Sequence, residues 1–317
     1  MYQKTHQNIQ EWYQTNGRHD LPWRNTTDAY KIWISEIMLQ QTQVKTVLER
    51  FYFPFLEKFP TLKSLGDAHI DEVLKMWEGL GYYTRAKNLH KTAQSIRKLP
   101  SDVEALEKLF GIGKNTAHAI ASFAFGQSVP IMEANVKRIL CRVFKLTSPK
   151  PNELWEFAQE LLDTKHSYEY NQALMDIGSM LCKPKEPKCK KCPLHNICQG
   201  QNSPTLYPTK IKRITPSKKE NIVIYLYNDK LSLTQREGKF LHKLWGFEHQ
   251  EVVPCACEYV GEVKHAYTHF KLTCKIFVYF ERKATKNDYF SPQQIKKLAI
   301  SKVDEKIVKR YLDTIPS

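Results

Sequence analysis

The sequence predicts a mainly α-helical N-terminal domain followed by a smaller α+β domain. From Lys4 to about Cys198, apolar residues recur at spacings of three and four, as they do along one face of a helix, and proline or glycine interrupts the pattern at intervals. After about residue 220 the pattern changes to short runs rich in β-branched and aromatic residues. A chain of 317 residues is long enough for two such domains.

The charge balance and the N-terminus restrict the class of protein. Lys and Arg exceed Asp and Glu by 15, and the pI is about 9.3. This excess favours a polyanionic partner such as DNA or RNA, although some basic proteins bind neither. The N-terminus lacks the apolar segment of a secretory signal, and no run approaches the ~18 apolar residues of a membrane span. We therefore expect a cytoplasmic protein without a membrane partner, whose cysteines are metal ligands or free thiols.

The domain boundary is predicted from a change in composition. Residues 201–219 are polar and basic and contain several prolines, which is typical of a linker. They would connect a first domain at 1–200 to a second domain at 220–317.

The elements of the second domain follow from residue types. Asn221–Tyr227 and Leu231–Thr234 have the composition of strands, and Asn228-Asp229 between them favours a hairpin turn. Phe270–Phe280 predicts a further strand, and Pro292–Leu312 predicts a helix.

Half of the eight cysteines lie within a short segment at 182–198. They are Cys182, Cys189, Cys192 and Cys198, with the spacing C-x6-C-x2-C-x5-C. Four thiolates at this spacing can surround one soft metal centre, either zinc or a [4Fe–4S] cluster, and spacing does not separate the two. The lysines around them suit a phosphate backbone.

A Gly-Ile-Gly turn joins two predicted helices within Leu106–Phe125. An apolar helix is expected to end at Gly111, and a second helix to begin near Asn115 or Thr116. Glycines at 111 and 113 let a ligand approach the backbone, and free N–H groups at the new helix N-terminus can bind a phosphate oxygen. An ordinary helix–turn–helix corner explains the same pattern about as well.

Glu36 lies in an unusually apolar predicted helix, Tyr30–Val44. Its neighbours three and four residues away are Ile32, Trp33 and Leu39. A desolvated carboxyl has a raised pKa, which suits a general acid near neutral pH. A glutamate that reaches solvent or pairs with a lysine is the alternative.

Taken together, these segments resemble the MutY family of adenine DNA glycosylases, within the helix-hairpin-helix superfamily. The matching pieces occur in the family's order over nearly the whole first domain. They are Leu21–Arg24, Ser35–Val44, Trp77–Ala86, Gly111–Gly113, Asn135–Arg138, Asn171–Asp176 and the four cysteines.

The resemblance implies the catalytic roles. Glu36 would protonate the adenine ring and later handle the water, and Arg24 and Gln172 would hold the extruded adenine. Glu133 would stabilise the positively charged sugar, as in the two-carboxylate logic of glycoside hydrolases. Asn115 stands where lyases of the superfamily carry a Schiff-base lysine, so the resemblance implies a monofunctional enzyme.

The resemblance also implies how DNA is bound. Gln41 and Tyr82 would wedge into the base stack around 8-oxoguanine, and Gly111 and Gly113 would belong to the phosphate-binding hairpin. The second domain resembles the family's MutT-like domain, in which Tyr267, Thr268 and His269 would sense 8-oxoguanine. It lacks the paired glutamates of a Nudix hydrolase near Arg236-Glu237, so it would bind and not hydrolyse nucleotides.

The cofactor and partners follow from the same family. The four cysteines would hold [4Fe–4S] rather than zinc. The partner would be double-stranded DNA containing adenine opposite 8-oxoguanine or guanine, bound by a monomer in the nucleoid of the cytoplasm.

Two segments depart from the family's pattern. Glu133 and Ala134 replace the usual aspartate and glycine of Asp-Gly-Asn-Val, and Phe110 replaces the proline of Leu-Pro-Gly. The first change leaves the rate and the choice of base open. The alternatives are a lyase of the endonuclease III type, a glycosylase for another base such as thymine opposite guanine, and a non-catalytic iron–sulfur DNA-binding protein.

Overall fold

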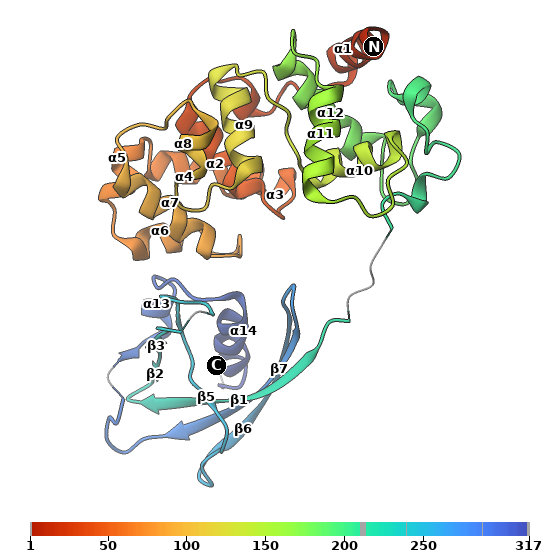
Figure 1. Cartoon of the computed structure of the whole chain (residues 1–317). Helices are drawn as coiled ribbons and strands as arrows, with labels where there is room; N and C mark the ends of the chain where they lie inside the picture. The colour runs from red at the N-terminus through yellow and green to blue at the C-terminus, as the bar shows by residue number, and fades with distance from the viewer. Residues whose placement is uncertain (1, 210–213, 239, 287, 316–317) are drawn as a thin grey trace. The chain divides into compact units, whose positions relative to one another are not determined.

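The computed structural model describes residues 2–209, 214–238, 240–286 and 288–315 (Figure 1). The chain divides into two compact units. Unit 1 comprises residues 1–52, 61–63 and 91–212, and unit 2 comprises 53–60, 64–90 and 213–317. Unit 2 therefore combines the C-terminal strands with a helical segment from the first third of the chain. The predicted division into 1–200 and 220–317 does not include this exchange.

Unit 1 is helical. Its helices and 3-10 turns are α1 (Gln3–Asn16), η1 (Pro22–Arg24), α2 (Ala29–Leu39), α3 (Val44–Arg50), α8 (Val103–Glu107), α9 (Lys114–Phe125), α10 (Ala134–Val143), α11 (Pro151–Leu161), α12 (Ser167–Met180), η2 (Cys189–Lys191), η3 (His195–Ile197) and η4 (Pro204–Leu206). Helices α5 (Leu62–Asp67) and α7 (Thr84–Ser95) cross the boundary between the units.

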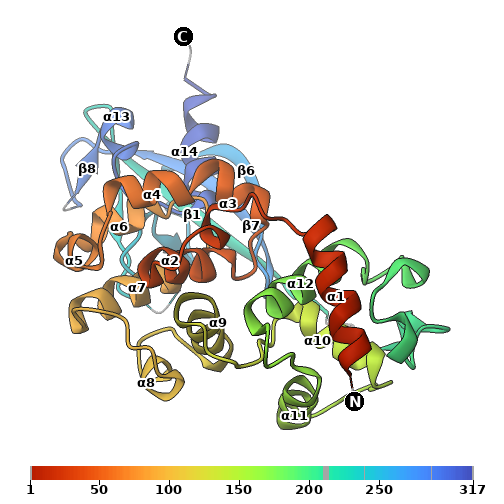
Figure 2. The same ribbon diagram turned by 90° about the horizontal axis from the view of Figure 1, so that it is seen from above.

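The core of unit 1 forms where α1 and α10 pack against α12 (Figure 2). Ile9, Ile139 and Ile177 from these three helices are buried in one cluster. The closest approach is at Gly178 of α12, where an added Cβ would lie 2.5 Å from the Cβ of Asn135 on α10. Glycine is therefore required at this crossing for reasons of space.

Helix α2 is shorter than the sequence predicts. It ends at Leu39, and Gln41 has a φ of 57°, so Gln40–Gln43 forms a turn before α3 instead of extending the helix to Val44. Every residue from Ile32 to Met38 is buried, so this part of the helix is enclosed on all sides.

The hairpin differs in its first half. Helix α8 ends at Glu107, earlier than the predicted end at Gly111, and a turn closed by the Ile112 N–H and the Leu109 carbonyl (3.2 Å) leads to α9. Gly111 has a φ of 76°, which favours glycine, and α9 begins at Lys114, next to the predicted start.

Unit 2 contains a six-stranded sheet of order β6-β7-β1-β2-β8, with β5 paired to β1, and the two-stranded ribbon β3-β4. The sheet strands are β1 (Ser217–Tyr227), β2 (Lys230–Ser232), β5 (His249–Gln250), β6 (Glu258–Ala266), β7 (Lys271–Phe280) and β8 (Tyr289–Phe290), and the ribbon is β3 (Thr234–Gln235) and β4 (Trp245–Gly246). Helices α13 (Pro292–Ile295) and α14 (Lys302–Leu312) lie on one face (Figure 1). Helix α6 (Ile70–Met76) also belongs to unit 2. Helix α4 (Tyr52–Lys58) belongs to it as well, except for its first residue, Tyr52, which is in unit 1.

The predicted hairpin is confirmed, since β1 and β2 pair antiparallel and Asn228 and Asp229 both have positive φ values. Strand β1 begins at Ser217, inside the expected linker, because it continues along β7 for ten parallel pairs. Residues 210–213 of that linker lie outside the described part of the chain. The expected C-terminal helix is two helices, with the Ser301 side chain capping the second.

Within the described residues, no helix is both long enough and apolar enough to cross a bilayer.

Candidate active site

Glu36 is placed by a buried helix. The Asp28 side chain caps α2 by accepting hydrogen bonds from the N–H groups of Tyr30 and Lys31. Two turns later, Glu36 is only 9% exposed. Burial raises its pKa to about 8; the nearby Glu133 carboxylate adds to this rise, and Arg24 opposes it. A carboxyl in this state holds a proton at neutral pH and can donate it.

Glu133 is the N-cap residue of α10, and its carbonyl accepts the first hydrogen bond of that helix from Lys137 (2.8 Å). Asn115, on the first turn of α9, contacts both Glu133 and the residue before it. The Asn115 Oδ1 accepts a hydrogen bond from the N–H of Met132 (2.7 Å), and its Nδ2 donates to the Glu133 carboxylate (3.5 Å). Burial raises the pKa of Glu133, and the Asn115 amide lowers it. The structure thus brings Glu36, Glu133 and Asn115 into one site.

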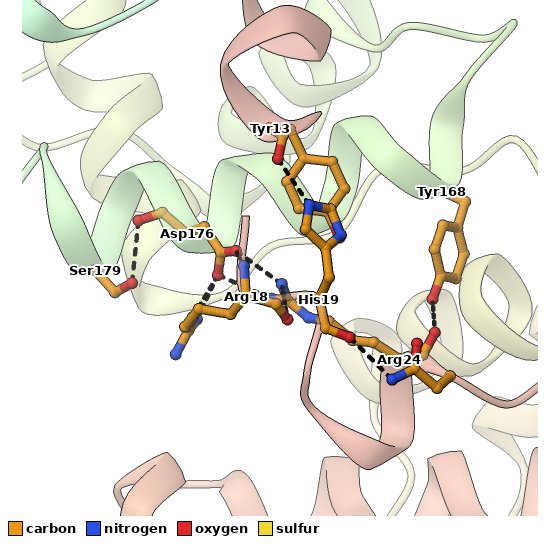
Figure 3. Close-up of polar contacts among 8 residues, drawn as sticks. Tyr13, Arg18, His19, Arg24, Tyr168, Asp176 and Ser179 are labelled. Carbon is orange, nitrogen blue, oxygen red and sulfur yellow. Dashed lines mark hydrogen bonds and ion pairs between the residues drawn. The ribbon is translucent and has the colours of Figure 1, made fainter. Parts of the chain in front are cut away.

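Arg24 is bound to a carboxylate that the sequence did not single out (Figure 3). Its Nη1 and Nη2 donate to the two oxygens of Asp176 at 2.7 and 2.9 Å, and the same oxygens accept from Arg18. The Tyr168 hydroxyl donates to the Arg24 carbonyl (2.8 Å). Arg24 and Asp176 are both buried, so this contact crosses from η1 to α12 inside the core.

Several polar atoms of unit 1 are buried and have no hydrogen-bond partner among the described residues, and three of them are Arg24 Nε, Trp33 Nε1 and Gln172 Oε1. A buried polar atom without a partner costs free energy, on the order of 1–3 kcal/mol. Two of the three belong to residues predicted to hold a base. They supply one donor and one acceptor for a polar ligand.

The hairpin and the turn after α2 lie next to each other. The Gln40 side chain donates to the Thr116 hydroxyl in the first turn of α9 (3.2 Å), and Gln41 beside it is exposed. Gly113 has an ordinary φ of −90°, and a Cβ built on it would meet nothing within 4 Å. The space in front of Gly113 is therefore open to a ligand such as a phosphate group.

The four cysteines line one cavity, as their spacing predicts. Buried Arg142 of α10 closes it: its Nη1 lies 3.2 Å from the Cys182 Sγ and 2.8 Å from the carbonyl of Lys183. In the part of the chain that the structure describes, no three His, Cys, Asp or Glu side chains are grouped as a single metal ion requires. Four thiol donors around one cavity fit a soft metal centre of zinc or iron–sulfur type.

The remaining predicted residues lie in unit 2. Tyr82 has a φ of 50°, and its hydroxyl hydrogen-bonds that of Thr268, in the turn between β6 and β7. The Arg85 guanidinium stacks on Tyr82 and donates to the carbonyls of Leu80 and Gly81. His269 is exposed, and Tyr267 packs on Phe270.

A cavity of about 450 Å³ adjoins the Tyr82–Thr268 pair. Its ionisable side chains other than tyrosine are all basic, and none of its lining residues is acidic: Lys87, His242, His265, His269 and Lys302. An anionic ligand would meet no carboxylate there.

Four residues of these sites were missed from the sequence: Arg18, Asp176, Arg85 and Arg142. Asp176 stands one helical turn after Gln172, and Arg142 directly follows the buried Cys141 in α10. A charged residue between apolar neighbours was the available signal for these two, because charged residues are rarely buried without a partner.

A helical unit with this hairpin, a buried carboxyl at Glu36 and a half-buried one at Glu133 defines a base-excision DNA repair protein of the helix-hairpin-helix class. The profile of the HhH-GPD superfamily base excision DNA repair proteins matches residues 34–164. Among curated relatives, an adenine DNA glycosylase of Buchnera aphidicola subsp. Acyrthosiphon pisum is 36% identical over 292 residues, covering 83% of each chain. The chain belongs to the adenine DNA glycosylase family.

Other relatives agree with this assignment. The adenine DNA glycosylase of Buchnera aphidicola subsp. Baizongia pistaciae is 39% identical over 74% of this chain and 70% of its own length, and the human one is 39% identical over 60% and 38%. The solved structure of a thermostable thymine-DNA glycosylase is 29% identical, with a TM-score of 0.58 over 63% of this chain and 97% of that one. A non-covalent endonuclease III–DNA complex (19%, TM-score 0.55, 64% and 97%) shares the fold.

Proposed function

We propose that this protein is a monofunctional DNA glycosylase that extrudes adenine paired with 8-oxoguanine or guanine from duplex DNA and hydrolyses its N-glycosidic bond. The observation that carries the proposal is the buried Glu36, whose pKa burial raises, beside a second carboxyl group, Glu133. An enzyme cannot reach a base inside a duplex, so the nucleotide must leave the stack first, at a cost of a few kcal/mol.

The unpartnered atoms of the pocket suit adenine. Adenine presents an amino donor beside a ring-nitrogen acceptor. The Gln172 Oε1 can accept from the amino group, and the Arg24 Nε–H can donate to a ring nitrogen. Both protein atoms are buried, so each would gain its missing partner when the base enters.

The two carboxyl groups divide the chemistry. Glu36 gives its proton to a ring nitrogen of adenine, and the electron pair of the C1′–N9 bond leaves with the neutral base. The sugar then carries positive charge, which ionised Glu133 stabilises. Water adds to C1′, and Glu36, now ionised, takes the proton released by that water.

The remaining predicted residues would hold the DNA. The hairpin at Gly111 and Gly113 would bind a phosphate of the duplex, and the exposed Gln41 and Tyr82 would fill the opened stack. Tyr267, Thr268 and His269 would contact 8-oxoguanine, in a MutT-like domain at 220–317. The domain at 1–200 would carry the chemistry, and the protein would act as a monomer in the nucleoid of the cytoplasm.

The four cysteines would hold a [4Fe–4S] cluster. Bound iron would supply iron–thiolate bonds that tie residues 182–198 together. Arg142 would hold that loop against α10 through the Cys182 thiol and two carbonyls. The lysines of the loop would then face the phosphate backbone.

A single-turnover assay tests the function. Duplexes with adenine opposite 8-oxoguanine, adenine opposite guanine, and thymine opposite guanine are compared, each with and without alkali. We expect base release from the first two duplexes and strand breaks only after alkali. Release of thymine alone would favour the enzyme for another base, strand breaks without alkali would favour a lyase, and no release from any duplex would favour a non-catalytic protein.

A further inference from the structure

We propose that Asp176 is a positioning residue for the reaction: it grips Arg24 by its two terminal nitrogens, turns the Nε–H of Arg24 towards the adenine, and balances the arginine's charge beside Glu36. This inference rests on the proposed function and names the residue that sets the geometry and charge of the adenine site.

Figure 3 shows the contacts that Asp176 makes with Arg24 and Arg18. Asp176 is fully buried, and both of its oxygens accept from Arg24 in the bidentate arrangement that fixes the guanidinium plane. Arg18 adds its backbone N–H (2.9 Å) and its Nε (2.7 Å) from the other side. The carboxylate therefore cannot turn away, and Arg24 is restrained in one orientation.

This orientation leaves the third nitrogen of Arg24 for the ligand. With Nη1 and Nη2 turned to Asp176, Nε is buried and has no partner among the described residues. Gln172 lies four residues before Asp176 on α12, hence on the same face of the helix. The residue that grips the arginine and the residue that supplies the acceptor are thus carried by one rigid element.

The charge of Asp176 also affects the proton on Glu36. Arg24 opposes the raised pKa of Glu36, whereas Glu133 supports it. The charged groups near Asp176 are Arg18 and Arg24, and Tyr13 faces the pair with its phenol. Without the Asp176 charge, the positive charge of Arg24 near Glu36 would be unbalanced and would lower the pKa of Glu36 further. Glu36 would then lose its proton at a lower pH, and the proton donor would be absent at neutral pH.

The test uses the full-length protein and the adenine:8-oxoguanine duplex, with single-turnover rates followed from about pH 5.5 to about pH 9.5. Asp176→Asn keeps size and removes the charge. We expect its rate at neutral pH to fall about ten- to a hundredfold, with the alkaline fall of the rate moved to lower pH. Affinity for a duplex carrying a non-cleavable adenosine analogue should change by less than about threefold, because the pocket, not the backbone contacts, is altered.

Arg18→Met gives an opposite prediction and keeps the proposal testable if Asp176→Asn does not fold. Arg18 is partly exposed, and its loss leaves the Arg24–Asp176 pair intact while removing one positive charge. Its alkaline limb should move to higher pH. A merely structural role for Asp176 would lower rates without moving either limb, and that result would overturn the inference.

The two proposals fail separately. If the wild-type protein releases no adenine, the proposed function is wrong. If it does, and both variants keep the wild-type pH profile, only the role of Asp176 is wrong.

Discussion

The amide of Asn115 connects the first turn of α9 to Glu133: it accepts from the peptide N–H just before that residue and donates to its carboxylate. The carboxylate is therefore tied to the second helix of the hairpin. A glutamate at this position is one methylene longer than the family's aspartate, and a misplacement near 1 Å can cost about a hundredfold in rate. The contact with Asn115 restrains the longer side chain from one side.

We therefore expect Glu133→Asp to be slower than the wild type in single-turnover release of adenine opposite 8-oxoguanine, by about tenfold or more. Glu133→Asn should be slower still, because it removes the charge that faces the sugar. A faster Asp variant would mean that the backbone has not adapted to glutamate. An Asn variant as fast as the wild type would remove Glu133 from the mechanism.

Glu36→Gln should abolish release, since an amide keeps the size of the side chain but delivers no proton. DNA affinity should stay within about twofold of the wild type. Residual activity above a few per cent of the wild-type rate would show that another group is the acid. Ser35→Ala, a change at the buried neighbour that only hydrogen-bonds the helix backbone, is the matched control.

The same residue predicts how stability depends on pH. The pKa of Glu36 rises from 4.5 to about 8 on folding, so the folded state holds this proton more tightly than the unfolded state. Its contribution to stability is complete below about pH 4.5 and is lost as the pH rises towards 8. At pH 8, the free energy of unfolding of Glu36→Gln should therefore exceed that of the wild type by on the order of 2 kcal/mol, and its urea midpoint should be higher. At pH 4.5 the two proteins should differ little. Equal midpoints at both pH values would contradict the buried, protonated carboxyl.

The cysteine cavity predicts about four iron and about four acid-labile sulfide per chain in an anaerobic preparation. Arg142→Gln should lose the cluster's absorbance several-fold faster under a chelator, because Arg142 contacts the Cys182 thiol and two carbonyls of the loop. Lys190→Gln, which removes the same charge from an exposed side chain, serves as the control. Stoichiometric zinc without sulfide would refute the cluster, and equal loss rates would refute the role of Arg142.

The Tyr82–Thr268 hydrogen bond predicts that a change at Thr268 weakens the discrimination between 8-oxoguanine and guanine. Thr268→Val removes the hydroxyl and keeps the shape, so we expect the rate ratio between adenine:8-oxoguanine and adenine:guanine duplexes to fall about fivefold or more. Thr273→Val, on the neighbouring strand, should leave the ratio unchanged. If both duplexes slowed equally, Thr268 would be structural.

Local patterns predicted the parts of the fold that depend on local sequence. The hairpin at Asn228-Asp229 and the four-cysteine loop follow from turn chemistry and from spacing. Strand β6 was missed because its alternation is broken by a bulge near Gly261, which has a φ of 143°. Strands of two residues, such as β5, are too short to show any period.

The candidate site was predicted only in part, for a physical reason. Motifs identified Glu36, Arg24 and Gln172 one by one. The Arg24–Asp176 pair joins residues 152 positions apart, and nothing in the local sequence of either specifies the other. Long-range ion pairs are decided by how helices pack, and periodicity does not contain that information.

Gly178 gives the chain a vulnerable position that bears no functional group. Any missense change of its codon adds atoms where α12 meets Asn135, and the added bulk would push the start of α10, with Glu133, away from Gln172. An allele of this kind would encode every reactive group intact and still change the spacing between Glu133 and Gln172. We expect such alleles to behave as mutators that are indistinguishable in a cell from those lacking Glu36, although a comparison of catalytic residues would score them as normal.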